Sequence, residues 1–181
     1  MTTLYLLGSA APPVLEIGSV IEAAQGRGYD VCLGLTPSAA RWLDPQLAEL
    51  EQLTGHPVRS AYRAPGAGDV WPRADVALFA PATFNSLNSW ALGLTSSFVV
   101  GFAAEAIGKS IPLVAMPCVN SAYAQHRALD RSIAELRSMG VSVLYGAGGF
   151  VPNPSGERWP YPWGLALDEV DDVRNRPLPG P

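Results

Sequence analysis

The chain has 181 residues, of which 48% are hydrophobic and only 15% are charged, and its net charge at pH 7 is −4. A chain of this length fits one domain with a sizeable core, and its acidic balance argues against nucleic acid or an anionic membrane as a partner. The low charge fraction indicates that other subunits cover part of the apolar surface, so we expect a homo-oligomer.

The first residues, MTTLYLLGSAAPPV, carry no positive n-region, and their apolar run is too short to span a bilayer. We therefore expect a cytoplasmic protein. Cys32 and Cys118 lie in apolar, strand-like contexts without a Cys-x-x-Cys motif or a Cys/His cluster. We expect reduced thiols rather than a disulfide, and no metal site.

Short aliphatic runs alternate with helical patterns along the chain. Strands are predicted at 3–7, 30–35, 57–62, 75–80, 111–117 and 141–146, and helices at about 14–27, 38–53 with a break at Pro45, 85–107 and 121–140. The strands lack polar alternation, which is typical of a parallel sheet covered on both faces. The order predicts a three-layer α/β fold with a doubly wound parallel sheet, Rossmann-like or flavodoxin-like.

The composition changes beyond Tyr145, where the chain reads GAGGFVPNPSGERWPYPWG. This segment is expected to form a long loop, and the final RPLPGP is expected to fray. The chain is thus predicted to be one domain over 1–181, with a mobile loop at 146–164 and a frayed tail at 174–181.

Small residues, hydroxyls and amides follow the predicted strands, without a carboxylate or a lysine. The segments are Gly8-Ser9-Ala10-Ala11, Thr36-Pro37-Ser38, Pro81-Ala82-Thr83-Phe84-Asn85 and Pro117-Cys118-Val119-Asn120. Each polar residue alone would be an ordinary helix N-cap. Four such ends at one edge of a parallel sheet instead favour a phosphate held by backbone amides. The sequence has neither a G-x-G-x-x-G after the first strand nor a P-loop, so a mononucleotide with a flat ring fits best.

The segment PATFNSLN at 81–88 resembles the P-A-S-A-N-T-I-N signature of the homo-oligomeric flavin-containing cysteine decarboxylases. That family includes the lantibiotic-type peptidyl-cysteine decarboxylases and phosphopantothenoylcysteine decarboxylase. The segment PCVNSAYA at 117–124 is similar to the family's second signature, P-x-M-N-x-x-M followed by an aromatic residue. Order, spacing and length also agree over about residues 3–146. The resemblance implies FMN as cofactor, bound between the subunits of a trimer that can assemble into a dodecamer.

By this resemblance the FMN phosphate and ribityl chain lie near the first two strand ends, and the isoalloxazine ring lies near 82–85. The residues assigned to the cofactor are Gly8, Ser9, Ala10, Thr36, Ser38, Pro81, Ala82, Thr83, Asn85, Ser96, Ser97 and Met116. Catalytic roles are implied for Asn85 and Asn120. Substrate contacts are implied for Pro117, Asn120, Trp159 and Tyr161, with Asn120 facing the substrate carboxylate.

The sequence also departs from the family. The position of the family's histidine base is occupied by Ala67. His56 is expected at the surface, and His126 is expected to be exposed or at a subunit contact. Ser96 and Ser97 replace an acid and an amide of the family pattern. The flavin site is nevertheless expected to be retained, while the usual catalytic base is absent.

The resemblance implies FMN-dependent oxidative decarboxylation of the C-terminal cysteine of a ribosomally made peptide to an aminoenethiol. The peptide is preferred to phosphopantothenoylcysteine because no lysine or arginine cluster stands for a phosphopantothenate site. The alternatives are an FMN-binding oligomer with another oxidoreductase or regulatory role, a phosphopantothenoylcysteine decarboxylase-like enzyme, and a binding module without flavin. The aromatic residues of 146–164 would either clamp an extended peptide or pack back on the domain or on a neighbouring subunit.

Overall fold

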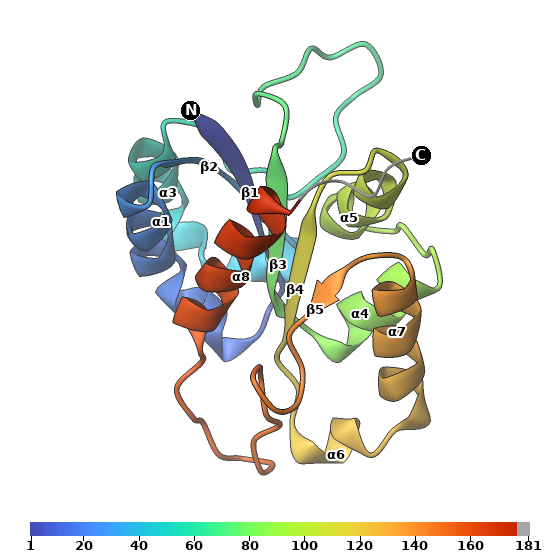
Figure 1. Ribbon diagram of the computed structural model, residues 1–181. Helices are drawn as coiled ribbons and strands as arrows, with labels where there is room; N and C mark the ends of the chain where they lie inside the picture. The colour runs from blue at the N-terminus through green and yellow to red at the C-terminus, as the bar shows by residue number, and fades with distance from the viewer. Residues whose placement is uncertain (177–181) are drawn as a thin grey trace.

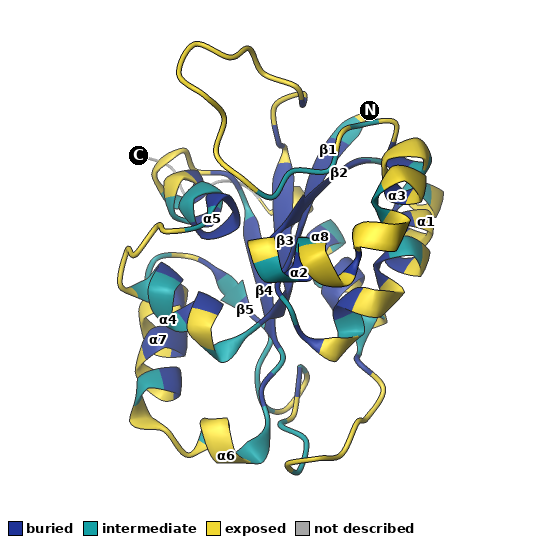
Figure 2. Ribbon diagram, turned by 180° about the vertical axis from the view of Figure 1, so that it is seen from behind, coloured by how far each residue is buried: buried dark blue, intermediate teal, exposed yellow. Residues whose placement is uncertain are grey.

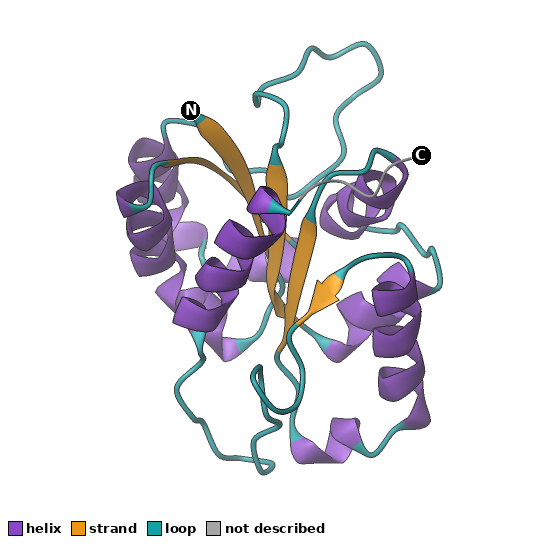
Figure 3. Cartoon of the chain, in the orientation of Figure 1, coloured by secondary structure: helices purple, strands orange, loops and turns teal. Residues whose placement is uncertain are grey.

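The aliphatic runs of the sequence form a parallel β-sheet in the computed structural model, which describes residues 1–176 (Figures 1 and 3). Within these residues the sheet has five strands in the order β2-β1-β3-β4-β5, the flavodoxin-like order of a doubly wound fold. The strands are β1 (Thr2–Gly8), β2 (Tyr29–Leu35), β3 (Val76–Ala82), β4 (Leu113–Pro117) and β5 (Ser142–Val143). The predicted fold class is confirmed.

Helices cover both faces of the sheet. They are η1 (Pro12–Glu16), α1 (Ile17–Gly26), α2 (Pro37–Trp42), η2 (Asp44–Gln46), α3 (Leu47–Thr54), α4 (Phe84–Ala91), α5 (Phe98–Gly108), α6 (Ser121–Ala124), α7 (Arg127–Ser138) and α8 (Trp163–Asn175). Helix α8 packs on β3 and β4 from one face, and α5 approaches β2 and β4 from the other (Figures 1 and 2). All seven residues of β3 are therefore buried, which explains its unbroken apolar run. The thiols of Cys32 and Cys118 are both free, as expected.

Two of the predicted strands are wrong or shortened. The strand expected at 57–62 is reduced to a single bridge between Gly34 and Arg59, because the chain turns away from β2 after Arg59 into the loop that leads to β3. The strand expected at 141–146 retains two residues, which pair with β4 at the edge of the sheet.

Two of the predicted helices are each divided. The helix expected at 85–107 is split into α4 and α5 because Gly93 adopts a left-handed conformation, with φ of 69°, and Ser97 caps a new helix. The helix expected at 121–140 is split into α6 and α7 by His126, whose ring nitrogen accepts a hydrogen bond from the Ala128 amide. The break expected at Pro45 is present, with η2 between α2 and α3.

Helix α8 was not predicted from the sequence. Its buried residues, Ala166, Leu167, Val170 and Val173, follow a helical spacing and pack into the core. Part of the tail expected at 174–181 therefore belongs to this helix, and 177–181 lie outside the described residues. Within residues 1–176, no helix combines the length and the apolar composition that a membrane crossing requires.

Asp171 ties α8 to β2 and α1. Its carboxylate accepts hydrogen bonds from the Tyr29 hydroxyl at 2.5 Å and from Arg27 at 2.8 Å. Burial alone would raise the pKa of Asp171, but the bonds from Tyr29 and Arg27 and the Arg27 charge outweigh it and lower the pKa.

We expect this tie to weaken in acid. Because the pKa of Asp171 is lower in the folded state, its contribution to stability is complete above the unfolded pKa of about 3.9 and is lost as the pH falls through the folded value. Asp171→Asn should therefore lower the melting temperature at pH 7, and the difference from the wild type should shrink toward pH 3. Asp172→Asn, one residue along on an exposed position, is the matched control. A pH-independent difference would contradict the assignment.

Candidate functional site

The carboxyl ends of β1, β2, β3 and β4 meet at one edge of the sheet, at the bottom of Figure 1. Backbone hydrogen bonds connect the segments that follow the strands: Ser9 N donates to Pro81 O, Thr36 N to Gly8 O and Cys118 N to Ala82 O, each at 2.9 Å. The sheet order reverses between β1 and β3, which is where ligands bind in open α/β sheets.

Three hydroxyl groups form a chain between β1 and α4. Thr83 Oγ1 donates to Ser86 Oγ at 3.1 Å, and Ser86 Oγ lies 2.8 Å from Ser9 Oγ. Ser9 and Ser86 are both buried, with 1% and 3% of their surface exposed. The chain therefore fixes the end of β1 against the start of α4, on the two sides of the point where the sheet order reverses.

The polar residues after the strands act as helix N-caps. Thr36 Oγ1 accepts from Ala39 N, Thr83 Oγ1 accepts from Ser86 N, and Asn120 Oδ1 accepts from Tyr123 N. Each cap uses one oxygen of its side chain, while the first amides of each helix have no acceptor within the helix. Capping thus accounts for the positions of these residues and leaves backbone donors at the sheet edge.

A cavity of about 810 Å³ opens in front of β1, β3 and β4. One of its walls is aromatic, because the rings of Phe84 and Tyr123 both line the cavity and are stacked with centroids 4.8 Å apart, while His126 meets Phe84 edge-on with centroids 5.5 Å apart. Ligand sites of this size are commonly apolar, with a few oriented polar groups. Three amide side chains line this cavity: Asn85 in the first turn of α4, Asn120 at the start of α6, and Asn153 of the segment after β5.

The segment after β5 closes one side of the cavity. Ser121 N donates to Asn153 O at 2.8 Å, and the buried Tyr161 hydroxyl donates to Met116 O at 2.6 Å. Burial raises the pKa of Tyr161 well above its usual value, so the hydroxyl stays neutral and remains a donor. Residues 154–160, with Trp159 about half exposed, lie between these two anchors.

The hydrogen bond from Tyr161 should contribute measurably to stability. Met116 lies where the register between β3 and β4 shifts, so a side chain supplies the donor that its carbonyl needs. Tyr161→Phe should lower the free energy of unfolding by about 1–2 kcal/mol, since a buried carbonyl loses its partner. Urea denaturation is the measurement, and Tyr123→Phe, which removes an exposed hydroxyl, should change little. Equal effects in both variants would count against the anchor.

The structure sorts the residues predicted for the site into three groups. Those that line the cavity are Ala10, Thr83, Asn85, Asn120, Trp159 and Tyr161. Those at the same sheet edge that lie behind or beside it are Gly8, Ser9, Thr36, Ser38, Pro81, Ala82, Met116 and Pro117. Ser96 and Ser97 are not brought to the cavity: they precede α5, where Ser97 Oγ accepts from Val100 N.

Neither histidine lines the cavity. His56 Nε2 lies 2.8 Å from Asp30 Oδ1, near the amino end of β2. His126 caps α7 and touches the wall through Phe84. Ala67 occupies the position at which the family resemblance places a histidine base. It lies in the loop between α3 and β3, which projects from the end of the sheet opposite to the cavity (Figure 1).

Several residues of the site were missed in the sequence. Phe84 lies inside the first motif, but its role as a wall depends on stacking with Tyr123 from a separate helix. Arg41 donates to Ser38 Oγ at 2.9 Å and so places a cation near the start of α2. Arg158 brings a second cation to the cavity from the closing segment. Arg41 could have been found from the sequence, because residues three positions apart on a helix are neighbours and Arg41 follows Ser38 by three. The approach of Arg158 to the cavity depends on how the segment after β5 folds, which no local sequence pattern indicates.

Comparison with known proteins gives a consistent picture. The family model described as Flavoprotein matches residues 3–160, while no curated protein sequence is a significant match. Among solved structures, the chain is similar to the FMN-dependent cysteine decarboxylase SpaF, at 20% identity and a TM-score of 0.72, covering 94% of this chain and 98% of that chain. It is similar to MrsD from Bacillus sp. HIL-Y85/54728 at 17% identity and a TM-score of 0.73, covering 96% of each chain. It is also similar to AnUbiX (PadA1) in complex with FMN and dimethylallyl pyrophosphate, at 14% identity and a TM-score of 0.70, covering 97% of this chain and 93% of that chain.

Proposed function

The chain belongs to the flavoprotein family, and from this premise we propose that it is an FMN-dependent decarboxylase that converts the C-terminal cysteine of a ribosomally made peptide to an aminoenethiol. The observation that carries the proposal is the cavity at the β1/β3 switch point, which is lined by an aromatic wall and by amide side chains. Structures of FMN-dependent cysteine decarboxylases share this fold over nearly the whole chain, which supports the same reading.

The residues present fit FMN. The start of α2 offers backbone amides, the Ser38 hydroxyl and the nearby Arg41 to a phosphate. The Thr83 cap and the first amides of α4 face the cavity from the other side of the switch point, where they can stabilise negative charge on a flat ring.

FMN, when bound, supplies the oxidising power for the cysteine, and the chain supplies orientation. Asn120 uses Oδ1 for its cap, so its amide NH₂ is left to donate to the substrate carboxylate. Asn85 lines the same cavity from the first turn of α4. The amide of Asn120, fixed by its cap, can hold the carboxylate with help from Asn85 while the thiol approaches the oxidant. The chain thereby supplies the orientation that the reaction needs.

The closing segment supports a peptide substrate. Trp159 is about half exposed and borders the cavity between prolines, so it can cover an extended chain at low entropic cost. Residues 154–160 are therefore the proposed clamp, which is shorter than the 146–164 expected from the sequence.

A homo-oligomer, a trimer or a dodecamer built from trimers, is part of the proposal. The loop that contains Ala67 and the cavity lie at opposite ends of the same sheet, so within one chain this loop does not complete the site. Exposed Leu92 and Leu94, between α4 and α5, add apolar surface for contact between copies.

The position of Ala67 also favours one alternative, an FMN-binding oligomer that lacks decarboxylase activity. Two measurements on the purified protein separate the readings. A yellow protein that releases FMN on heating, identified by mass spectrometry, is expected under both. A peptide ending in cysteine should then lose CO₂ and two hydrogens, whereas the same peptide ending in serine should not. A colourless protein that takes up no added FMN would refute both functions. A yellow protein that is inert toward a broad set of cysteine-ending peptides would refute the decarboxylase and support the FMN-binding oligomer without that activity.

A further inference from the structure

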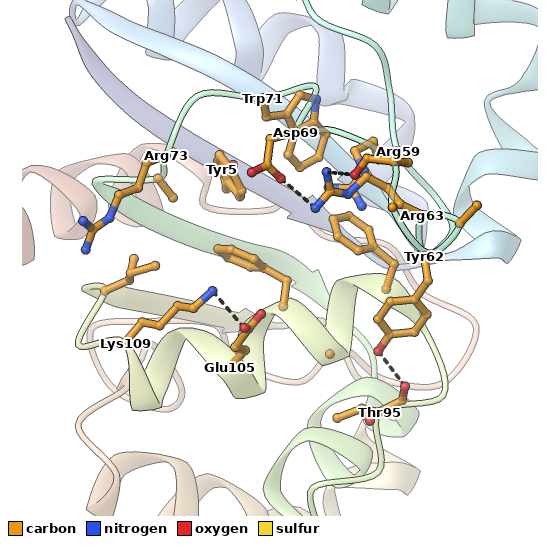
Figure 4. A pocket seen from close by; sticks show the side chains of 18 residues that line it. Tyr5, Arg59, Tyr62, Arg63, Asp69, Trp71, Arg73, Thr95, Glu105 and Lys109 are labelled. Carbon is orange, nitrogen blue, oxygen red and sulfur yellow. Dashed lines mark hydrogen bonds and ion pairs between the residues drawn. The ribbon is translucent and has the colours of Figure 1, made fainter.

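A second cavity, of about 930 Å³, lies between α5 and the loop that joins α3 to β3 (Figure 4). Among the described residues it shares no lining residue with the cavity at the strand ends. Tyr5 of β1 contributes to its floor, and Phe98 and Phe102 of α5 contribute to its walls. Within one chain, the cavity is thus separate from the one at the strand ends and lies on the α5 face of the sheet, with Ala67 among its lining residues.

The polar atoms of the surrounding rings are already used. The bonds run from Tyr5 Oη to Pro72 O at 2.6 Å, from Trp71 Nε1 to Pro57 O at 2.8 Å and from Tyr62 Oη to Thr95 O at 2.7 Å. The helix leaves room for Tyr62 at Gly101, where a Cβ would overlap the tyrosine hydroxyl. What these rings present to a ligand is therefore their apolar surface.

The charged side chains of the cavity are unevenly paired. Arg63 binds Asp69 at 2.6 Å and Lys109 binds Glu105 at 2.8 Å. Arg59 has neither an ion pair nor a side-chain hydrogen bond with any of the residues 1–176. The lining thus carries unpaired positive charge, in a protein whose net charge is −4.

Arg59 is fixed in place before any ligand arrives. Its backbone is bound to β2 on both sides, by Arg59 N to Leu33 O and by Leu35 N to Arg59 O. Its guanidinium lies 3.8 Å from the ring centroid of Phe98 and 5.0 Å from that of Trp71. Desolvation, followed by the charge of Arg63, lowers the pKa of Arg59. The guanidinium charge is therefore partly buried without a counter-charge, and a bound anion would supply one.

We propose that this second cavity binds a small organic anion, in which a carboxylate or phosphate group meets Arg59 and a flat apolar body lies among Tyr5, Phe98 and Phe102. The carboxylates of Asp69 and Glu105 are each engaged by a cation, so the cavity offers donors and ring faces rather than free acceptors. A neutral ligand of the same shape would leave Arg59 without a partner.

Calorimetric titration of the purified protein with benzoate and with phenyl phosphate tests the proposal, and benzyl alcohol serves as the neutral probe. We expect both anions to bind at least about tenfold more tightly than the alcohol, with an affinity that falls as salt is added. The anion that binds more tightly identifies the group that the cavity prefers. Arg59→Gln should lower the anion affinity by about tenfold or more, and Arg59→Lys should retain part of it.

Arg41→Gln is the matched control, since it removes one arginine charge beside the strand-end cavity. If Arg41→Gln abolishes anion binding and Arg59→Gln does not, the probes occupy the strand-end cavity and the proposal is wrong. It is also wrong if Arg59→Gln changes the oligomeric mass measured by light scattering while anion affinity is unchanged, because the cavity would then be a contact between copies. Release of FMN on heating is measured separately, so failure of this proposal leaves the proposed function untouched.

Discussion

Asn120→Asp should reduce turnover of a cysteine-ending peptide by about 100-fold or more while FMN stays bound. Aspartate caps helices as well as asparagine does, so the bond to the Tyr123 amide is kept. The substitution replaces the free NH₂ donor with a negative oxygen that repels the substrate carboxylate, and the loss of one oriented donor costs about 10²–10³ in rate. Single-turnover decarboxylation followed by mass spectrometry gives the rate, and the visible spectrum gives the flavin content.

Asn120→Ser distinguishes the loss of the donor from the added charge. Serine also caps but carries no carboxylate, so its rate should lie between those of the wild type and Asn120→Asp. A peptide amidated at its C-terminus cannot be decarboxylated, but its binding affinity is the complementary probe: it has no carboxylate for aspartate to repel, so wild type and Asn120→Asp should bind it equally. If Asn120→Asp instead loses its flavin, Asn120 belongs to the cofactor side of the cavity and the assignment to substrate is wrong.

Removing the buried hydroxyl pair should destabilise the protein without removing FMN. Ser9→Ala leaves Ser86 with Thr83 as its one remaining hydroxyl partner, whereas Ser86→Ala leaves the hydroxyls of both Ser9 and Thr83 without it; each variant should cost about 1–2 kcal/mol in the free energy of unfolding. The double variant should cost less than the sum of the two, with a coupling of about 1 kcal/mol, because the contact between Ser9 and Ser86 is lost in each single variant.

The flavin content of these variants tests the role of Ser9 independently. Its hydroxyl is occupied by Ser86 and 1% of the residue is exposed, so we expect it to position the end of β1 rather than to touch FMN. Denaturation curves and the released FMN are measured on the same samples. A Ser9→Ala protein of unchanged stability that loses FMN would place this hydroxyl in direct contact with the cofactor.

The strands were predictable because their information is local. Strands β1 to β4 are continuous aliphatic runs, and the predicted ranges differ from the structure by at most two residues at either end. The ends of the helices were less predictable, because the helical spacing of apolar residues continues past the residues at which one helix ends and the next begins. Gly93 and Ser97 break the helix expected at 85–107, and both were visible in the sequence as stop and start signals.

The strand-end site was predictable in outline because parallel strands bring their carboxyl ends together. That is why Thr83, Asn85 and Asn120 could be placed at one cavity from sequence alone. Its aromatic wall was not, since the stacking of Phe84 on Tyr123 depends on how α4 and α6 approach each other. The cavity at Arg59 had no local signal at all, because most of its lining comes from an irregular loop and a helix distant in the sequence.

The segment from Asn153 to Tyr161 is anchored at both ends, by Asn153 to Ser121 and by Tyr161 to Met116. While both of these hydrogen bonds are made, the middle of the segment can move outward, but the segment cannot open as a lid hinged at one end. A free chain end can slip past it into the cavity, whereas the middle of a polypeptide or a closed ring would have to push the whole segment aside. The enzyme would therefore select a peptide terminus by topology, before any of its side chains is recognised.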